Sequence, residues 1–249
     1  MRIPRIYQAT PLKTGDSITL DAQAATHVAR VLRLKQHDQI IVFNGQGGEY
    51  VGVIADIDKR SVKVTLENYQ QPQTESPLHI SLVQGISRSE RMDYTLQKSI
   101  ELGVSEICPV TTQHISVHLD TVRAQKKRIH WQGVVNSACE QSGRDRVPEV
   151  HELVPLQSCV EKISAGQDQS MLVLDHRAST TLNQVSMTKN NRIIMVVGPE
   201  GGLSDEERDW LVGKGFTAVS MGPRVLRTET AALAAIAVMQ SLWGDFSHA

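Results

Sequence analysis

Two short loops in the last third of the chain share one pattern, which constrains the fold more than any other feature of the sequence. VVGPEGG at 196–202 and SMGPRVLRTETA at 220–231 each follow an apolar, strand-like run and then break into Gly-Pro. Glycine permits backbone angles that are closed to other residues, and proline removes a hydrogen-bond donor. We therefore expect two strands that end abruptly, with the free backbone groups of both loops available to one small molecule.

Segments typical of strands and of helices alternate through the second part of the chain. Strand-like runs lie at 79–86, 106–110 and 171–174, and a long helical pattern lies at 123–142. This alternation predicts a mostly parallel sheet with helices on both faces. The dinucleotide-binding form of that fold requires a G-x-G-x-x-G turn after its first strand, but the chain reads GISRSE at 85–90. The sequence therefore does not indicate a dinucleotide site.

Three helix starts can be predicted from capping residues and composition. Ser87 with Glu90, and Ser204 with Glu207, have the spacing of a capping box. A further helix from Thr228 to about Trp243 is nearly all apolar. Because a helix without a polar face must be covered on most sides, we expect other parts of the protein or a second copy to pack on it.

The first 70 residues read as a small β-rich unit. Strand-like runs lie at 40–43, 49–57 and 61–66, separated by residues typical of turns. One amphipathic helix interrupts the strands. Its expected apolar face consists of Ala24, Val28, Val31 and Leu32. A short barrel with one helix is the simplest closure of so few strands.

A polar stretch with two prolines separates these two patterns and has the composition of a linker. We therefore divide the chain into a β-rich domain at 1–70, a linker at 71–77 and an α/β domain at 78–249. The formal net charge is −1, so the total charge does not indicate a nucleic-acid partner. The acidic excess lies after residue 146, so an RNA-facing surface should come from the residues before it.

Cysteine spacing and hydropathy exclude several other classes of protein. The three cysteines, Cys108, Cys139 and Cys159, are widely spaced, which argues against a disulfide framework and against a Cys-type zinc site. His114 and His118 have the spacing of metal ligands but no carboxylate or thiol beside them, so we expect no metal. No apolar run approaches the roughly 20 residues that span a bilayer, and MRIPR at 1–5 has no hydrophobic stretch of signal-peptide type, so we expect a cytoplasmic protein without a membrane partner.

Beyond these local patterns, the sequence resembles one family. GPEGG followed by GPRVLRTETA is similar to the SPOUT superfamily of S-adenosylmethionine-dependent RNA methyltransferases. More narrowly, it resembles the RsmE-type family, which methylates N3 of a uridine in 16S ribosomal RNA. The resemblance covers the whole chain, including MRIPRIY at 1–7, HVARVLR at 27–33, QKSIELG at 97–103 and CEQSGR at 139–144.

This resemblance implies an α/β protein with a small N-terminal PUA-like, RNA-binding β-barrel and a C-terminal SPOUT α/β domain that contains a trefoil knot. It implies S-adenosylmethionine as the cofactor, 16S rRNA or the small ribosomal subunit as the partner, and a homodimer as the assembly. Adenosylmethionine is an intrinsically reactive sulfonium, so the protein must align its methyl group with the acceptor and remove the N3 proton. No metal is needed for that reaction.

The resemblance also implies roles for single residues. The cofactor-binding positions are Leu174, Gly198, Glu200, Gly201, Gly202, Met221, Gly222, Leu226, Arg227 and Thr228. As catalytic groups, Arg88, Arg224 and Arg227 could steady the uridine imidate. Glu200 could accept the proton, or it could equally accept backbone N–H groups at a helix start. The RNA-binding candidates are Arg2, Arg5, Arg30, Arg33, Arg88 and Arg144.

Several alternatives stay open on the sequence. Arg30 and Arg33 could be a solvated helix end, and Arg144 with Glu140 could be a plain ion pair on a helix surface. The cofactor loops are shared more widely than the substrate, so the target could instead be a ribose 2′-oxygen or a tRNA base. The chain could also be an RNA-binding protein that no longer catalyses a reaction.

Overall fold

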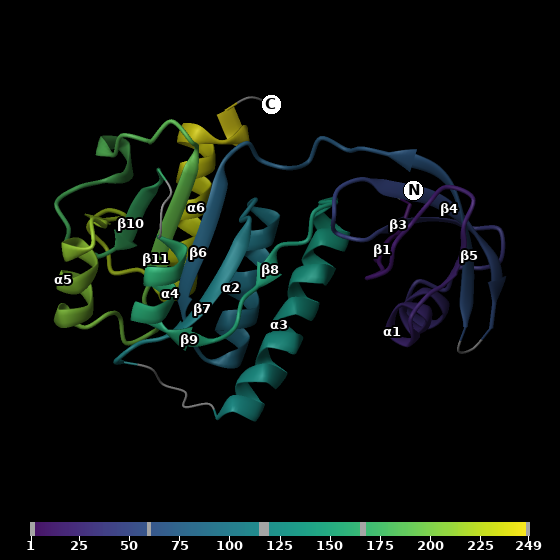
Figure 1. Cartoon of the computed structure of the whole chain (residues 1–249), viewed down its shortest axis with the longest axis horizontal. Helices are drawn as coiled ribbons and strands as arrows, with labels where there is room; N and C mark the ends of the chain where they lie inside the picture. Colours follow the sequence, from purple (N-terminus) through teal and green to yellow (C-terminus); the bar gives the residue numbers. More distant parts are fainter. Residues whose placement is uncertain (1–2, 59–60, 115–119, 165–167, 248–249) are drawn as a thin grey trace. The chain divides into compact units, whose positions relative to one another are not determined.

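The structure, a computed structural model, describes residues 3–58, 61–114, 120–164 and 168–247 (Figure 1). Arg2 and His118 lie outside the described residues. The chain forms two compact units. The first comprises Met1–Glu75 and Asn136–Val147, and the second comprises Ser76–Val135 and Pro148–Ala249. The fold is mixed α/β, with an N-terminal sheet and a C-terminal parallel sheet, as predicted.

The first unit contains a five-stranded sheet in the order β1-β3-β4-β5-β2. Its strands are β1 (Arg5–Tyr7), β2 (Ser17–Thr19), β3 (Gln39–Phe43), β4 (Glu49–Ile57) and β5 (Val62–Gln70). β1 pairs with β3 in parallel, and the other neighbours are antiparallel. Alternate residues such as Val62, Val64 and Leu66 are fully buried, because successive side chains of a strand point to opposite faces.

One helical segment packs on the core of this sheet. α1 (Ala22–Thr26) begins at Asp21, whose carboxylate accepts the N–H of Ala24, and it continues as a π-helical turn, η1 (His27–Val31). Val28 is buried, but Val31 is 66% exposed, so the prediction that Val31 belongs to the apolar face is wrong. The π turn is wider than an α turn, and it therefore rotates Val31 out of the stripe that a regular helix would keep.

The segment 136–147 belongs to the first unit, although it includes the end of α3 (Thr121–Ser142). The buried guanidinium of Arg144 forms paired hydrogen bonds with the carboxylate of Glu75, with N–O distances of 2.6–3.2 Å. Glu140 instead accepts the backbone N–H of Tyr7 at 2.9 Å. The predicted alternative of an Arg144–Glu140 surface pair is therefore wrong, because each side chain is held by a group from the first 75 residues.

The second unit contains a parallel sheet in the order β12-β10-β11-β6-β7-β8, and β9 also pairs with β7. Its strands are β6 (His79–Gly85), β7 (Glu106–Thr111), β8 (Glu149–Val150), β9 (Val154–Pro155), β10 (Ser170–Leu174), β11 (Arg192–Val197) and β12 (Thr217–Val219). β11 and β6 are almost entirely buried, as is typical of central strands covered on both faces.

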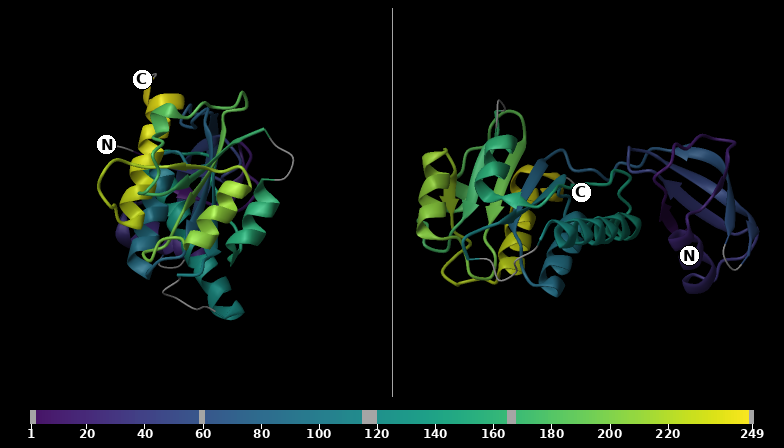
Figure 2. Two further views of the ribbon diagram at one scale, coloured as in Figure 1. Left: turned by 90° about the vertical axis from the view of Figure 1, so that its left-hand side faces the viewer. Right: turned by 60° about the horizontal axis from the view of Figure 1, so that its bottom comes forward.

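Helices cover both faces of this sheet (Figure 2, left). α4 (Leu156–Ile163) and α5 (Asp205–Gly213) pack on one face, in a core that includes Val83, Val173 and Val196. α2 (Ser89–Glu101) and α6 (Thr228–Trp243) pack against each other on the opposite face. Among the described helices, none has the length and apolar character required to cross a membrane.

The two predicted capping boxes have different outcomes. Ser204 and Glu207 form the predicted box at the start of α5, with Glu207 N–Ser204 Oγ at 3.1 Å. At α2 the predicted box is wrong: the helix begins at Ser89, and its cap residue Arg88 makes no side-chain capping bond. The Arg88 N–H at this helix start donates to the distant Glu200 at 2.9 Å.

Candidate functional site

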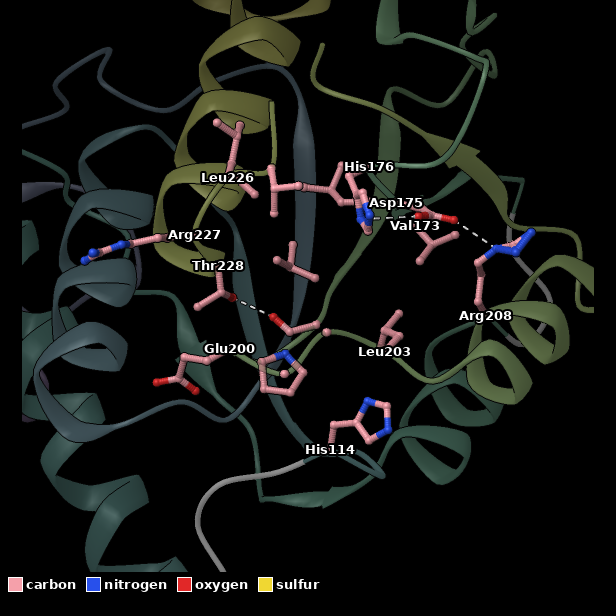
Figure 3. Close-up of a pocket in the computed structure, with 18 of the residues that line it drawn as sticks. His114, Val173, Asp175, His176, Glu200, Leu203, Arg208, Leu226, Arg227 and Thr228 are labelled. Atoms are coloured by element: carbon pink, nitrogen blue, oxygen red, sulfur yellow. Dashed lines mark hydrogen bonds and ion pairs between the residues drawn. The ribbon is translucent and has the colours of Figure 1, made fainter. Parts of the chain in front are cut away.

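A cavity of about 490 Å³ lies at the carboxyl ends of β10, β11 and β12, where ligands bind in open α/β sheets (Figure 3). Strand register brings the three ends together, because Val173 pairs with Val196 and Leu174 with Val219. The lining residues are Arg91, His114, Val173, Leu174, Asp175, His176, Arg177, Val197, Gly198, Pro199, Glu200, Gly201, Gly202, Leu203, Ser204, Asp205, Arg208, Val219, Met221, Arg224, Val225, Leu226, Arg227, Thr228 and Ala231.

The cavity therefore includes every predicted cofactor residue except Gly222. Gly222 is exposed and has a φ of +93°, a conformation that favours glycine. A Cβ built at Gly222 meets nothing within 4 Å, so this glycine is required by the turn and not by a close neighbour. The structure thus gives Gly222 a role in shaping the second loop beside the cavity.

The first loop turns tightly at Gly198 and is tied to the start of α6. A Cβ at Gly198 would approach the backbone N of Leu203 to 2.9 Å, so a side chain cannot fit without moving the loop. The carbonyl oxygen of Gly198 accepts the hydroxyl of Thr228 at 2.6 Å. Thr228 accepts in turn from the buried amide of Gln84 in β6 at 3.1 Å. One hydroxyl therefore joins both Gly-Pro loops to the central strand.

The carboxylate of Glu200 accepts a hydrogen bond from the backbone at the start of α2. Its Oε1 accepts the Arg88 N–H and lies 3.5 Å from a guanidinium nitrogen of Arg91. Its Oε2 is buried and has no hydrogen-bond partner among the described residues. The side chain is only 16% exposed. Of the two roles considered for Glu200, this geometry is that of the carboxylate accepting a backbone N–H.

Two of the three predicted catalytic arginines line the cavity and one does not. Arg224 and Arg227 line the cavity and are exposed, and Arg227 is directed away from Asp175 and His176 (Figure 3). Neither forms an ion pair with a described residue. Arg88 is exposed and is not among the lining residues, so it contributes its backbone N–H to the site through Glu200.

A charged cluster on the opposite wall was missed by the sequence predictions. Asp175 follows β10 directly and is 9% exposed; its carboxylate accepts the Arg177 N–H at 2.9 Å and pairs with Arg208 at 2.9 Å. His176 Nδ1 lies 3.8 Å from the same carboxylate. Burial alone would raise the pKa of Asp175, but the hydrogen bonds from Arg177 and the charge of Arg208 outweigh it, so the pKa lies below its ordinary value.

The sequence carried one signal for this cluster, since Asp175 is the first residue after a predicted strand whose end also lies at the cavity. His114 was considered only as a metal ligand, and the structure places it against Gly201 on the cavity wall: a Cβ at Gly201 would lie 2.9 Å from His114 Cβ. No local pattern in the sequence indicated that contact, because residues 114 and 201 are brought together only by the sheet.

The predicted RNA-binding arginines fall into two groups. Arg30 and Arg33 are exposed at the end of the helical segment, and Arg33 has a φ of 54°. The side chain of Arg5 is buried, pairs with Glu49 and donates to the carbonyl oxygen of Arg144 at 2.9 Å. Among the predicted RNA-binding arginines that the structure describes, Arg30, Arg33 and Arg88 are exposed, whereas the side chains of Arg5 and Arg144 are buried.

Comparison with known proteins agrees with this geometry. Residues 20–67 match the PUA domain of RNA methyltransferases, and residues 74–240 match the RNA methyltransferase domain. Ribosomal RNA small subunit methyltransferase E of Buchnera aphidicola (subsp. Schizaphis graminum) is 33% identical, with 99% of each chain covered.

Two solved structures extend the likeness to three dimensions. A methyltransferase of Legionella pneumophila in complex with S-adenosylmethionine has 38% identity and a TM-score of 0.93, with 99% of this chain and 100% of that chain covered. Ribosomal RNA small subunit methyltransferase E of Neisseria gonorrhoeae, also bound to S-adenosylmethionine, has 37% identity and a TM-score of 0.91, with 98% and 100% covered. The chain therefore belongs to the RNA methyltransferase family, within the group of the ribosomal RNA small subunit methyltransferases E.

Proposed function

We propose that this protein transfers the methyl group of S-adenosylmethionine to N3 of a uridine in the 16S rRNA of the small ribosomal subunit. The observation that carries this proposal is the cavity formed by both Gly-Pro loops at the strand ends, in a chain that matches S-adenosylmethionine-bound relatives over nearly its whole length. Membership of the methyltransferase E group supplies the substrate class.

The lining of the cavity fits this cofactor. A volume of about 490 Å³ is ordinary for a small-molecule site, and backbone groups of 198–202 and 221–228 make up much of the wall. Leu226 and Val173 supply apolar surface. The buried Oε2 of Glu200 needs a donor, which a hydroxyl or an ammonium group of the cofactor can supply. When bound, the cofactor supplies an electrophilic methyl group.

The protein's own residues then have to hold the uridine and stabilise its N3 anion. We assign this role to Arg224 and Arg227, whose side chains line the cavity without ion pairs to described residues. A guanidinium offers paired donors to the imidate or to a neighbouring phosphate. Arg88, exposed at the start of α2, is a further contact for RNA or substrate. Glu200 is better suited to holding the first loop than to taking the proton, because Arg88 already occupies its Oε1.

RNA recognition is assigned to residues 1–70 as a PUA-like barrel, joined by the linker 71–77 to the methyltransferase domain at 78–249. The exposed Arg30 and Arg33 would contact phosphates there, while Arg5 and Arg144 would first have to leave Glu49 and Glu75. We also propose that the C-terminal domain carries the trefoil knot of the SPOUT superfamily and that the protein acts in the cytoplasm, where small subunits are assembled.

A homodimer is proposed because α6 is not fully covered within its unit. Ala232, Ile236 and Met239 are buried, but Leu233 and Val238 are only half-buried and Leu242 is 40% exposed. A contiguous apolar surface on a soluble protein commonly marks an interface. Sedimentation at the assay concentration tests this, and a fully active monomer would contradict it.

Nucleoside mapping of 16S rRNA tests the proposed function most directly. A strain lacking the gene should lose one N3-methyluridine, and expression of the full chain should restore it, whereas an Arg224→Ala, Arg227→Ala variant should not. Loss of a ribose 2′-O-methyl group or of a tRNA modification would support the alternative substrates. Calorimetry that detects RNA binding but no binding of S-adenosylmethionine would support the non-catalytic alternative.

A further inference from the structure

A second group of reactive side chains lies on the parallel sheet, toward the starts of its strands and away from the cavity at their ends. Glu106 and Cys108 are the first and third residues of β7, so their side chains point to the same face. β8 pairs with β7 in parallel, and the N–H of His151 donates to the carbonyl oxygen of Ile107 at 2.9 Å. This pairing places His151 beside Cys108.

The three side chains converge on one point. A carboxylate oxygen of Glu106, the sulfur of Cys108 and a ring nitrogen of His151 all lie within 4.8 Å of one another. His151 Nε2 is 2.7 Å from Glu106 Oε2. These separations are close to those between ligand atoms around a tetrahedral ion, since zinc bonds of about 2.0–2.3 Å place neighbouring ligand atoms roughly 3–4 Å apart.

Neighbouring residues fix the Glu106 carboxylate in place and leave part of the three-residue cluster accessible to solvent. Ser81 Oγ donates to Glu106 Oε1 at 2.5 Å, which fixes the orientation of the carboxylate, as outer hydrogen bonds do around metal ligands. Cys108 is 5% exposed and belongs to the same buried core cluster as Cys159 of α4. The side chains of Glu106 and His151 are 23% and 32% exposed. The sulfur is therefore shielded, and the other two ligands reach solvent.

We propose that Glu106, Cys108 and His151 bind a single zinc ion, with a water molecule in the fourth position. A set of one sulfur, one nitrogen and one oxygen ligand is suited to zinc, whereas calcium and magnesium prefer oxygen alone. The cysteine spacing in the sequence predicted no metal. The proposal departs from that prediction because parallel strand pairing, which spacing cannot show, brings 106–108 next to 151.

The competing explanation is a metal-free polar network in which His151 simply donates to Glu106. It predicts that the full chain, freed of metal by a chelator and kept reduced with a phosphine, takes up no stoichiometric Zn²⁺ in equilibrium dialysis. We expect one zinc per chain instead. Cys108→Ser and His151→Gln should each weaken zinc binding more than about tenfold. Loss of even an outer hydrogen-bonding partner of a metal ligand weakens metal binding by about 10- to 100-fold, and loss of a ligand itself should cost more.

Matched variants keep this test specific. Cys139→Ser changes another buried cysteine, in the first unit, and His130→Gln changes a histidine paired with Asp93 on the helices; both should bind zinc as the parent does. Co²⁺ in place of zinc should give a thiolate-to-cobalt absorption band that Cys139→Ser retains and Cys108→Ser loses. Glu106→Gln, nearly isosteric, provides a further weakened variant if Cys108→Ser fails to fold. Equal zinc affinity in parent, His151→Gln and Glu106→Gln would overturn the proposal.

Discussion

Replacement of Thr228 by valine tests whether one hydroxyl holds the two loops of the cavity together. Valine has the same shape but cannot donate to the partly buried carbonyl of Gly198 or accept from the buried amide of Gln84. A buried carbonyl left without a partner destabilises a protein by about 1–3 kcal/mol. Gln84 Nε2 already lies 3.5 Å from the same carbonyl and keeps a bond to Gly85, so we expect the lower part of that range, about 1–2 kcal/mol.

The same change acts on cofactor binding, because Gly198 and Thr228 both line the cavity. If the lost free energy appeared entirely in binding, the Kd for S-adenosylmethionine would rise about 5- to 30-fold. Urea unfolding would measure the free energy of unfolding, and calorimetry would measure the Kd. Thr228→Ser keeps the hydroxyl and is the matched control. A valine variant that equals the parent in both measurements, or a serine variant as impaired as valine, would refute the role of the hydroxyl.

Three further predictions concern the second loop, the charged wall and the N-terminal unit. Gly222→Ala should weaken S-adenosylmethionine binding because φ is +93° there, whereas Gly213→Ala, which also has open space around its Cβ but no positive φ, should not; equal calorimetric affinities would contradict this. The lowered pKa of Asp175 contributes stability that is present above about pH 3.9, the ordinary aspartate value, and is lost as pH falls through the lower folded value. Asp175→Asn should therefore be less stable than the parent at pH 7, with a difference that shrinks in acid, and a pH-independent difference in urea unfolding would count against it. Arg30→Gln with Arg33→Gln should reduce the salt dependence of RNA binding by about one unit of slope or more without changing cofactor affinity, and an unaltered slope in filter binding would remove these residues from the RNA surface.

Much of the second unit could be predicted from its sequence because its signals are local. The apolar run expected before the first Gly-Pro loop is a strand, β11 (Arg192–Val197), and Ser204 with Glu207 marks the start of α5 correctly. Such patterns depend on burial and on groups a few residues apart. The Gly-Pro loops were predictable for the same reason, and both line the cavity.

The errors arise where a distant residue takes over a local role. Ser87 and Glu90 have capping-box spacing, yet the N–H at the start of α2 is satisfied by Glu200, which comes from a loop more than a hundred residues away. Arg208 pairs with Asp175 across the cavity wall in the same way. Spacing rules assume that the partner of a group is the nearest suitable group along the chain. That assumption fails where the fold brings a group that is distant in the sequence within bonding distance.

The CEQSGR segment shows what this means for function. Its sequence allowed a surface ion pair or an RNA contact, but Arg144 is 5% exposed and bound to Glu75, Glu140 holds the Tyr7 N–H, and Asp145 accepts the Gly48 N–H at 2.5 Å. Removing one partner of such a buried pair leaves a charge without compensation, so Arg144→Ala should lower stability before it affects any RNA contact. Residues of a family motif can therefore have a structural role, which here is to join the end of α3 to the N-terminal sheet. Among the RNA-binding candidates that the structure describes, the arginines exposed to solvent are then Arg30, Arg33 and Arg88.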